Sequence, residues 1–149
     1  MDPSALRRQI EPVFRRHKTV IVAYLFGSTA RGDAHDRSDL DLAVLLKSTD
    51  LAGYRALWAD LHDVLLPRPF DLVTLNTADP LLCFEVISDG QPLYYRSDDE
   101  LNSFETRAWQ RYRDTRHLRA IGDHYLAARA DEWSSNRKRS ASASSDSKK

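Results

Sequence analysis

The stretch LFGSTARGDAHDRSDLDLAVLL, residues 25–46, contains two apolar runs separated by small and charged residues. The run TVIVAYLF (19–26) leads into it, and its β-branched and aromatic residues predict a buried strand. The pair Gly27-Ser28 ends this run, and DLDLAVLL (39–46) predicts a second strand. Aspartate is depleted in strands, so two aspartates at the head of an apolar run indicate a function rather than a solvated strand end.

Those two aspartates are Asp39 and Asp41. Residues two apart in a strand point to the same face, so their backbones would stand about 6–7 Å apart on one side of the sheet. A third carboxylate, Asp71, opens the run PFDLVTL (69–75), which predicts another strand. Asp71 could join the pair if this strand lies alongside; otherwise it is a strand-entry residue after Pro69.

Three converging carboxylates repel one another unless cations neutralise them. Hard oxygen ligands suit Mg²⁺, and two such ions roughly 3.5–4 Å apart are the usual clamp for nucleotidyl displacement. The pattern predicts that Asp39 and Asp41 bridge two magnesium ions. Asp71 would hold the ion that activates the attacking hydroxyl, or take the proton of that hydroxyl.

The pair Gly27-Ser28 precedes TARG, which predicts a first helical turn. Backbone N–H groups at a helix start bind anions, and glycine lets a phosphate approach the backbone closely. The Ser28 hydroxyl and the Arg31 guanidinium are further candidate donors to a triphosphate. An arginine in a surface turn needs no such role, so Arg31 is equally compatible with plain solvent exposure.

The remaining elements follow from apolar spacing and from helix start and stop signals. Ser4 is the expected cap of the first helix, Pro12 indicates a kink or a restart in it, and Asp79 caps the third helix. The predicted fold class is α/β (α+β), a small mixed sheet with packed helices. Helices are expected over 4–17, 50–66, 77–90 and about 98–131, and a short edge strand over 91–96.

The chain has 149 residues, of which 42% are apolar and 30% charged, as in ordinary globular proteins. We expect one domain over residues 1–133, followed by a disordered, serine- and lysine-rich tail over 134–149. No apolar run approaches the roughly 20 residues of a membrane span. With a single cysteine, Cys83, which is expected in the core, these features favour a cytoplasmic protein.

The formal net charge of zero conceals an uneven distribution. The tail carries five Lys or Arg and one Asp, so residues 1–133 carry a net charge of −4. A protein that holds nucleic acid along an extended surface normally has a basic body, so direct nucleic-acid binding is not expected here.

The spacing Gly-Ser, ten residues, Asp-Leu-Asp resembles the signature of the DNA polymerase β-type nucleotidyltransferase superfamily. The short length, the sequence FGSTARGD and the helix after LLCFEVISDGQPLYY are similar to its minimal members, in particular to the MntA-type antitoxins that accompany HEPN-domain toxins. The resemblance covers roughly residues 6–130 and implies a nucleotidyltransferase fold with a long C-terminal helix.

The resemblance also implies an activity: transfer of AMP from ATP to a tyrosine of the partner HEPN ribonuclease, which no longer cuts RNA afterwards. Carried over by position, Gly27 and Ser28 would hold the triphosphate. Asp39 and Asp41 would bind two Mg²⁺ ions, and Asp71 would be the third carboxylate. Nothing in the motif departs from the pattern of an active enzyme.

Two other functions stay open. The protein could be a binding-only antitoxin that covers the toxin, or a nucleotidyltransferase acting on a small molecule such as an aminoglycoside. The run RAWQRYRDTRHLR (107–119) combines arginines with Trp109 and Tyr112. These are residues of interface anchors, so this run is either a protein-docking face or a solvated helix face, and RNA binding is a weaker third reading.

Overall fold

The computed structural model describes the backbone of residues 2–33 and 38–145, and the side chains of residues 2–33 and 38–131. The chain divides into two compact units, Met1–Tyr112 and Arg113–Lys149. The first unit contains the sheet and the helices packed on it, and the second contains a long helix. The boundary falls before residue 133, where the sequence places the end of the domain.

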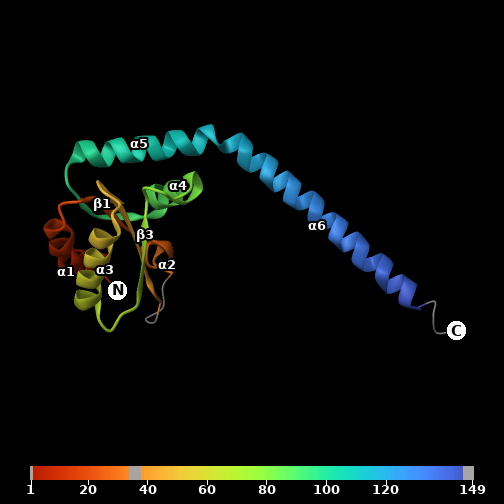
Figure 1. Ribbon diagram of the computed structural model, residues 1–149, viewed down its shortest axis with the longest axis horizontal. Coiled ribbons are helices and arrows are strands. Elements are labelled where there is room, and N and C mark those ends of the chain that lie inside the picture. The colour runs from red at the N-terminus through yellow and green to blue at the C-terminus, as the bar shows by residue number, and fades with distance from the viewer. Residues whose placement is uncertain (1, 34–37, 146–149) are drawn as a thin grey trace. The chain divides into compact units, whose positions relative to one another are not determined.

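Four strands form one mixed sheet in the first unit (Figure 1). Its order is β3-β2-β1-β4, with β1 antiparallel to β2 and to β4, and with β2 and β3 parallel. The mixed sheet and the edge position of the fourth strand confirm the prediction. The strands are β1 (Val20–Phe26), β2 (Leu40–Leu46), β3 (Phe70–Thr74) and β4 (Gln91–Tyr95).

Alternation along β1 divides the core between the two faces of the sheet. Ala23 and Leu25 pack in a cluster with the buried residues of α1 (Pro3–Arg16) and α3 (Leu51–Leu65). Val22 and Tyr24 pack in a second cluster with α4 (Pro80–Asp89) and the first part of α5 (Asp98–Asp114). Successive side chains of a strand point to opposite faces, so helices cover both faces of the sheet.

Carboxylate side chains cap the helices α1 and α4. Asp79 accepts from the backbone N–H of Leu82 at 2.9 Å, which confirms the predicted cap of α4. The cap of α1 is Asp2 and not Ser4, because the Asp2 carboxylate accepts from the backbone N–H of Ser4 at 2.9 Å. The helix therefore begins one residue earlier than predicted, at Pro3, and it runs through Pro12 to Arg16 as one element.

The single helix expected over about 98–131 is two helices, α5 and α6 (Arg116–Ser145), separated at Thr115. Aspartate and threonine both have low helix propensity, so Asp114 and Thr115 form a weak point that the regular apolar spacing conceals. The α6 backbone continues to Ser145, within the stretch expected as a disordered tail; residues 146–149 lie outside the described part. Within that part, no helix combines the length and hydrophobicity needed to span a membrane.

Candidate active site

The turn after β1 depends on Gly27. Its φ is +71°, a left-handed conformation that side chains disfavour. A Cβ atom at this position would lie 2.2 Å from Asp41 Oδ2. The contact arises because Phe26 and Asp41 are partners in the β1–β2 ladder, which carries Asp41 over the turn. Glycine is therefore required both by the backbone conformation and by the neighbouring carboxylate.

The short helix α2 (Gly27–Arg31) follows and is closed by backbone hydrogen bonds. Gly32, with φ +79°, donates to the carbonyl of Thr29, and Asp33 donates to the carbonyl of Ser28 at 3.0 Å. The left-handed glycine lets the chain turn back after a single helical turn. Ser28 is half-buried in this turn, at the end of the strand where the sequence predicts it.

The three predicted carboxylates lie at the same end of the sheet as the turn. Asp41 and Asp71 are direct partners in the parallel β2–β3 pair. Asp39 precedes the first residue of β2, Leu40, and is exposed. Burial raises the pKa of Asp41, and the nearby charges of Asp71 and Asp39 raise it further. Three like charges therefore act on one another here.

Arg31 lies near enough to lower the pKa of Asp41, against the three causes that raise it. Its guanidinium also forms an ion pair with Asp33 at 3.6 Å, and its side chain is half exposed. The positive charge of Arg31 thus acts on Asp41, while its guanidinium is paired with Asp33. This placement is compatible with a donor to a bound phosphate and with an ordinary surface arginine.

The donor set fits a divalent cation. Carboxylate oxygens are the preferred ligands of Mg²⁺, and a cation would relieve the repulsion that raises the pKa of Asp41. Among the described residues, no group of three His, Cys, Asp or Glu side chains lies close enough together to hold one metal ion. Asp39 and Asp71 are exposed, so their side chains can rotate toward Asp41 without displacing a packed neighbour.

Two hydrogen bonds that support this site could not be predicted from the sequence. Gln91 of β4 donates its side-chain amide to the carbonyl of Ala30 in α2 at 3.2 Å. Arg68 donates to the carbonyl of Ser38 at 3.4 Å, next to Asp39. These pairs are separated by 61 and 30 positions in the chain, so no local pattern signals them.

The remaining candidates lie away from this site. Cys83 is 1% exposed in the core, as predicted. In the arginine-rich run, Tyr112 stacks on Phe84 of α4 with ring centroids 3.8 Å apart, while Trp109 is 49% exposed. Tyr112 therefore has a packing role, whereas about half of the Trp109 side chain is exposed.

Comparisons with known proteins show the family to which the chain belongs. The family model described as "Polymerase beta, Nucleotidyltransferase" matches residues 8–99. The protein adenylyltransferase MntA of Shewanella oneidensis is 38% identical over 86 residues, which are 56% of this chain and 60% of the relative. The chain thus spans less than two thirds of that relative.

Solved structures extend the similarity to more of the chain. A crystal structure of the toxin–antitoxin MntA–HepT contains a chain that is 25% identical, with a TM-score of 0.63 over 83% of this chain and 98% of that one. A toxin–antitoxin structure with AMP-PNP contains a chain that is 28% identical, with a TM-score of 0.67 over 80% and 98%.

Proposed function

The chain belongs to the polymerase beta nucleotidyltransferase family, and from this premise we propose that it transfers AMP from ATP to a tyrosine of a HEPN ribonuclease toxin, which is thereby neutralised. The observation that carries the proposal is the placement of Asp41 over the Gly27 turn with Asp71 in register beside it. Similarity to a protein named adenylyltransferase and to toxin–antitoxin structures, one of them with AMP-PNP, supports it.

In this proposal the turn at Gly27 and Ser28 binds the triphosphate of ATP. Backbone N–H groups at the start of α2 and the Ser28 hydroxyl donate to phosphate oxygens. Because Gly27 has no side chain, the Asp41 carboxylate can lie directly against the turn that would bind the triphosphate. Arg31 adds a guanidinium on the exposed side of the same turn.

Asp39 and Asp41 would hold two Mg²⁺ ions, and Asp71 would hold one of them as the third carboxylate. Bound magnesium would supply charge neutralisation of the phosphates and a lowered pKa for the attacking hydroxyl. The carboxylates bring their negative charge to the end of two parallel strands, beside the phosphate-binding turn. Nucleotide and acceptor would therefore meet at this edge of the sheet.

The chemical step is a displacement at the α-phosphorus of ATP. The tyrosine oxygen of the acceptor forms a bond to this phosphorus, and the bond from phosphorus to the oxygen bridging the α- and β-phosphates breaks. Diphosphate leaves with that electron pair, and the hydroxyl proton passes to Asp71, which is exposed at the edge strand β3. The products are an O-adenylylated tyrosine and diphosphate.

We propose that the acceptor arrives on another protein. The described residues form one sheet with its helices and one further helix, and they include no second lobe that would enclose a small acceptor. A tyrosine presented by a partner needs only access to the exposed edge at Asp71. A reaction that consumes ATP and silences a ribonuclease belongs in the cytoplasm.

Intact-mass spectrometry tests this function. The HEPN protein encoded beside this one would be incubated with the full chain, ATP and Mg²⁺. We expect a mass gain of one or more AMP units, and no gain with the Asp39→Asn/Asp41→Asn variant. Asp98→Asn/Asp99→Asn is the matched control, since it removes the same charge at two exposed positions that follow β4 at the end of the sheet away from Gly27.

The same variants separate catalysis from binding. Two results together would establish the binding-only antitoxin instead. The Asp39→Asn/Asp41→Asn variant would still silence the toxin, and the unmodified protein would transfer no AMP. Transfer of AMP to an aminoglycoside, with none to the HEPN protein, would establish the small-molecule enzyme.

A further inference from the structure

The first unit has an uneven distribution of charge. Residues 1–18 contain five Lys or Arg and two Asp or Glu, whereas residues 19–112 contain eight and fifteen. The excess positive charge is therefore concentrated on α1, in a unit that is otherwise acidic. A local concentration of this kind attracts anions even where the net charge of the protein does not.

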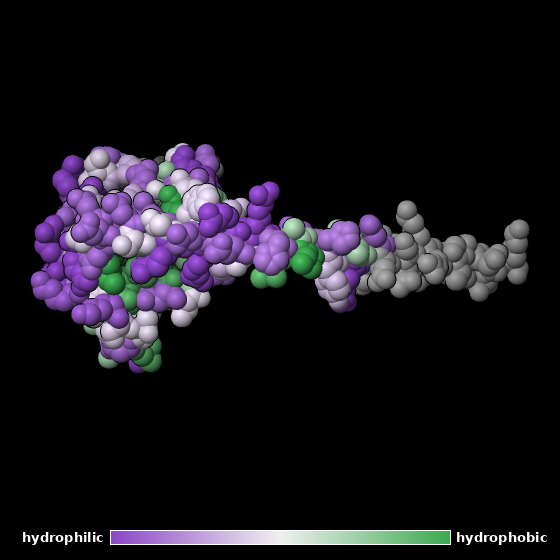
Figure 2. Space-filling view, turned by 90° about the horizontal axis from the view of Figure 1, so that it is seen from above, coloured by the Kyte–Doolittle hydropathy of each residue, from purple (hydrophilic) through white to green (hydrophobic). Residues whose placement is uncertain are grey.

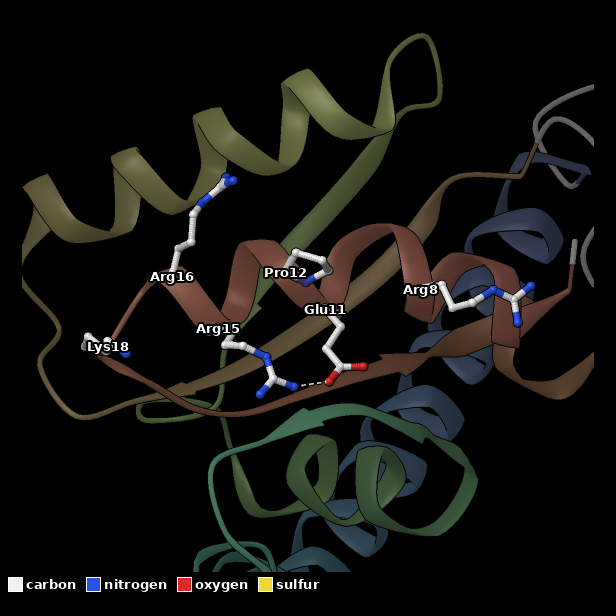
Figure 3. A pocket seen from close by; sticks show the side chains of 6 residues that line it. All are labelled: Arg8, Glu11, Pro12, Arg15, Arg16 and Lys18. Atoms are coloured by element: carbon white, nitrogen blue, oxygen red, sulfur yellow. Dashed lines mark hydrogen bonds and ion pairs between the residues drawn. The ribbon is translucent and has the colours of Figure 1, made fainter.

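The cations of α1 surround a hollow that is open to solvent and about 930 Å³ in volume (Figure 3). Figure 3 shows Arg16 pointing toward α3, while Arg15 and Glu11 point to the other side of α1. The side chains thus fan out around the helix rather than form a single row. The lining residues are Arg8, Glu11, Pro12, Arg15, Arg16 and Lys18.

Ion pairs neutralise only part of this charge. Glu11 is shared between Arg15 at 2.5 Å and Arg7 at 3.5 Å. Arg16 contacts Asp60 of α3 at 3.4 Å. In the described part of the chain, no ion pair involves Arg8 or Lys18. Two cations at opposite ends of the hollow are thus available to an incoming anion.

The Lys18 end of the hollow is separate from the turn at Gly27. Lys18 lies just before β1, and Gly27 lies just after it, at the other end of the strand. Seven residues of extended chain span about 23 Å at roughly 3.3 Å per residue. A triphosphate bound at Gly27 therefore lies out of reach of Lys18.

The lining indicates which kind of anion fits. It contains no aromatic side chain, so it cannot stack a base, and Pro12 is its one apolar residue. Its lining residues also include none of the aromatic anchors that are enriched in protein interfaces. Contacts made almost wholly by Lys and Arg are typical of binding to a nucleic-acid backbone.

We propose that the α1 hollow binds the phosphate backbone of a single-stranded nucleic acid, without regard to base. Arg8 and Arg15 are seven residues apart on the helix, about 10.5 Å at 1.5 Å per residue, so they would contact different phosphates. Guanidinium groups recognise phosphates through paired hydrogen bonds, and Lys18 adds a point charge at one end of the hollow. The proposal does not rest on AMP transfer.

Fluorescence anisotropy of a labelled oligo-uridine, titrated with the full chain at low salt, tests the proposal. We expect Arg8→Glu to weaken binding about tenfold, and Arg55→Glu to weaken it less than about twofold. Arg55 is the matched control because it too is an exposed arginine within a helix, and its reversal changes the net charge equally. Equal losses in the two variants would overturn the proposal.

A second variant measures the contacts directly. For single strands, the dependence of log K on log salt has a slope of about −0.7 per phosphate contact. Arg8→Ala/Lys18→Ala should therefore reduce the slope by about 1.4, and circular dichroism should show an unchanged fold. An unchanged slope would place the binding elsewhere, for example on the basic residues 134–149, and would overturn the proposal.

Competition identifies the chemistry of the ligand. Oligo-thymidine of the same length should compete as well as oligo-uridine does, because neither base nor sugar is contacted. Polyphosphate should also compete, whereas polyglutamate of matched charge should not. Equal competition by polyglutamate would show a site for acidic protein segments and would contradict the phosphate assignment.

Discussion

The carboxylate of Asp41 occupies the space that a side chain at position 27 would need, with Oδ2 only 2.2 Å from an ideal Cβ on Gly27. The turn proposed to bind phosphate and the Asp41 carboxylate are therefore parts of one packed arrangement. A side chain added at position 27 must displace Asp41.

Gly27→Ala tests this dependence. We expect AMP transfer to fall by at least about 10²-fold and stability to fall by about 1–3 kcal/mol, because the methyl group displaces Asp41 and the left-handed backbone is strained. Gly32→Ala is the matched control: its φ is +79°, but among the described residues no atom beyond its chain neighbours lies within 4 Å of its Cβ position. It should lose about 1–2 kcal/mol of stability from the backbone alone and keep most of its activity. Transfer rates and denaturant unfolding measure both, and equal activity losses would contradict the Asp41 contact as the cause.

Asp41→Asn should separate stability from activity. Burial, Asp71 and Asp39 all raise the pKa of Asp41, so its charged form is held at a cost to the folded state in the absence of a cation. We expect the variant to melt at the same temperature as the unmodified protein, or higher, when the metal is chelated, and to lose AMP transfer. Thermal melts with EDTA and with Mg²⁺ check this. The unmodified protein should gain stability from Mg²⁺, whereas the variant should gain much less; an equal gain in both would exclude Asp41 as a ligand.

The hydrogen bond from the Tyr24 hydroxyl to Glu105, 2.7 Å long, ties β1 to α5. Burial and this bond to a carboxylate both raise the pKa of Tyr24, so the hydroxyl remains a donor at alkaline pH. We expect Tyr24→Phe to cost about 1–2 kcal/mol of unfolding free energy, since the ring still fills its place while a hydrogen bond to a charged group is lost. Tyr24→Phe, Glu105→Ala and their combination form a double-mutant cycle in urea. Additive effects would mean that the two side chains do not interact.

The pair His17–Asp60, 2.8 Å from Nε2 to Oδ2, connects the end of α1 to α3. The hydrogen bond from His17 is the largest cause that lowers the pKa of Asp60 below its ordinary value of 3.8. A carboxyl with a lowered folded-state pKa stabilises the fold above its unfolded-state pKa, and this contribution is lost as the pH falls through the folded-state pKa. Asp60→Asn should therefore melt below the unmodified protein at neutral pH. The difference should shrink on acidification below about pH 4, as melting curves over a pH series will show. A difference that stays constant in acid would assign the effect to packing.

The strands and most of the helices could be predicted because each depends on a local pattern. A continuous apolar run gives β1 two buried faces, and Asp79-Pro80 starts α4 by cap chemistry alone. The break at Thr115 could not be predicted, since the apolar spacing continues across it and only a weak local propensity marks it. Asp2 was missed as a cap because Ser4 is an equally suitable residue type nearby.

Some features of the candidate site could likewise be predicted from the sequence, and others could not. The sequence indicates Gly27, Ser28 and the three aspartates because their residue types are unusual at the ends of strands. The steric contact between Gly27 and Asp41 depends on the register of β1 against β2, which no local pattern encodes. The same holds for Gln91, whose role as a support for α2 exists only once β4 has paired with β1.

The closure of α2 has a consequence for how nucleotide exchange is timed. Its carbonyl groups are already engaged by Gly32, Asp33 and Gln91, so this part of the turn is held before a ligand arrives. A preorganised cradle loses little chain entropy on binding, and the nucleotide need not wait for the loop to order. In the AMP transfer proposed above, ordering of this turn would therefore add nothing to the time that each reaction takes.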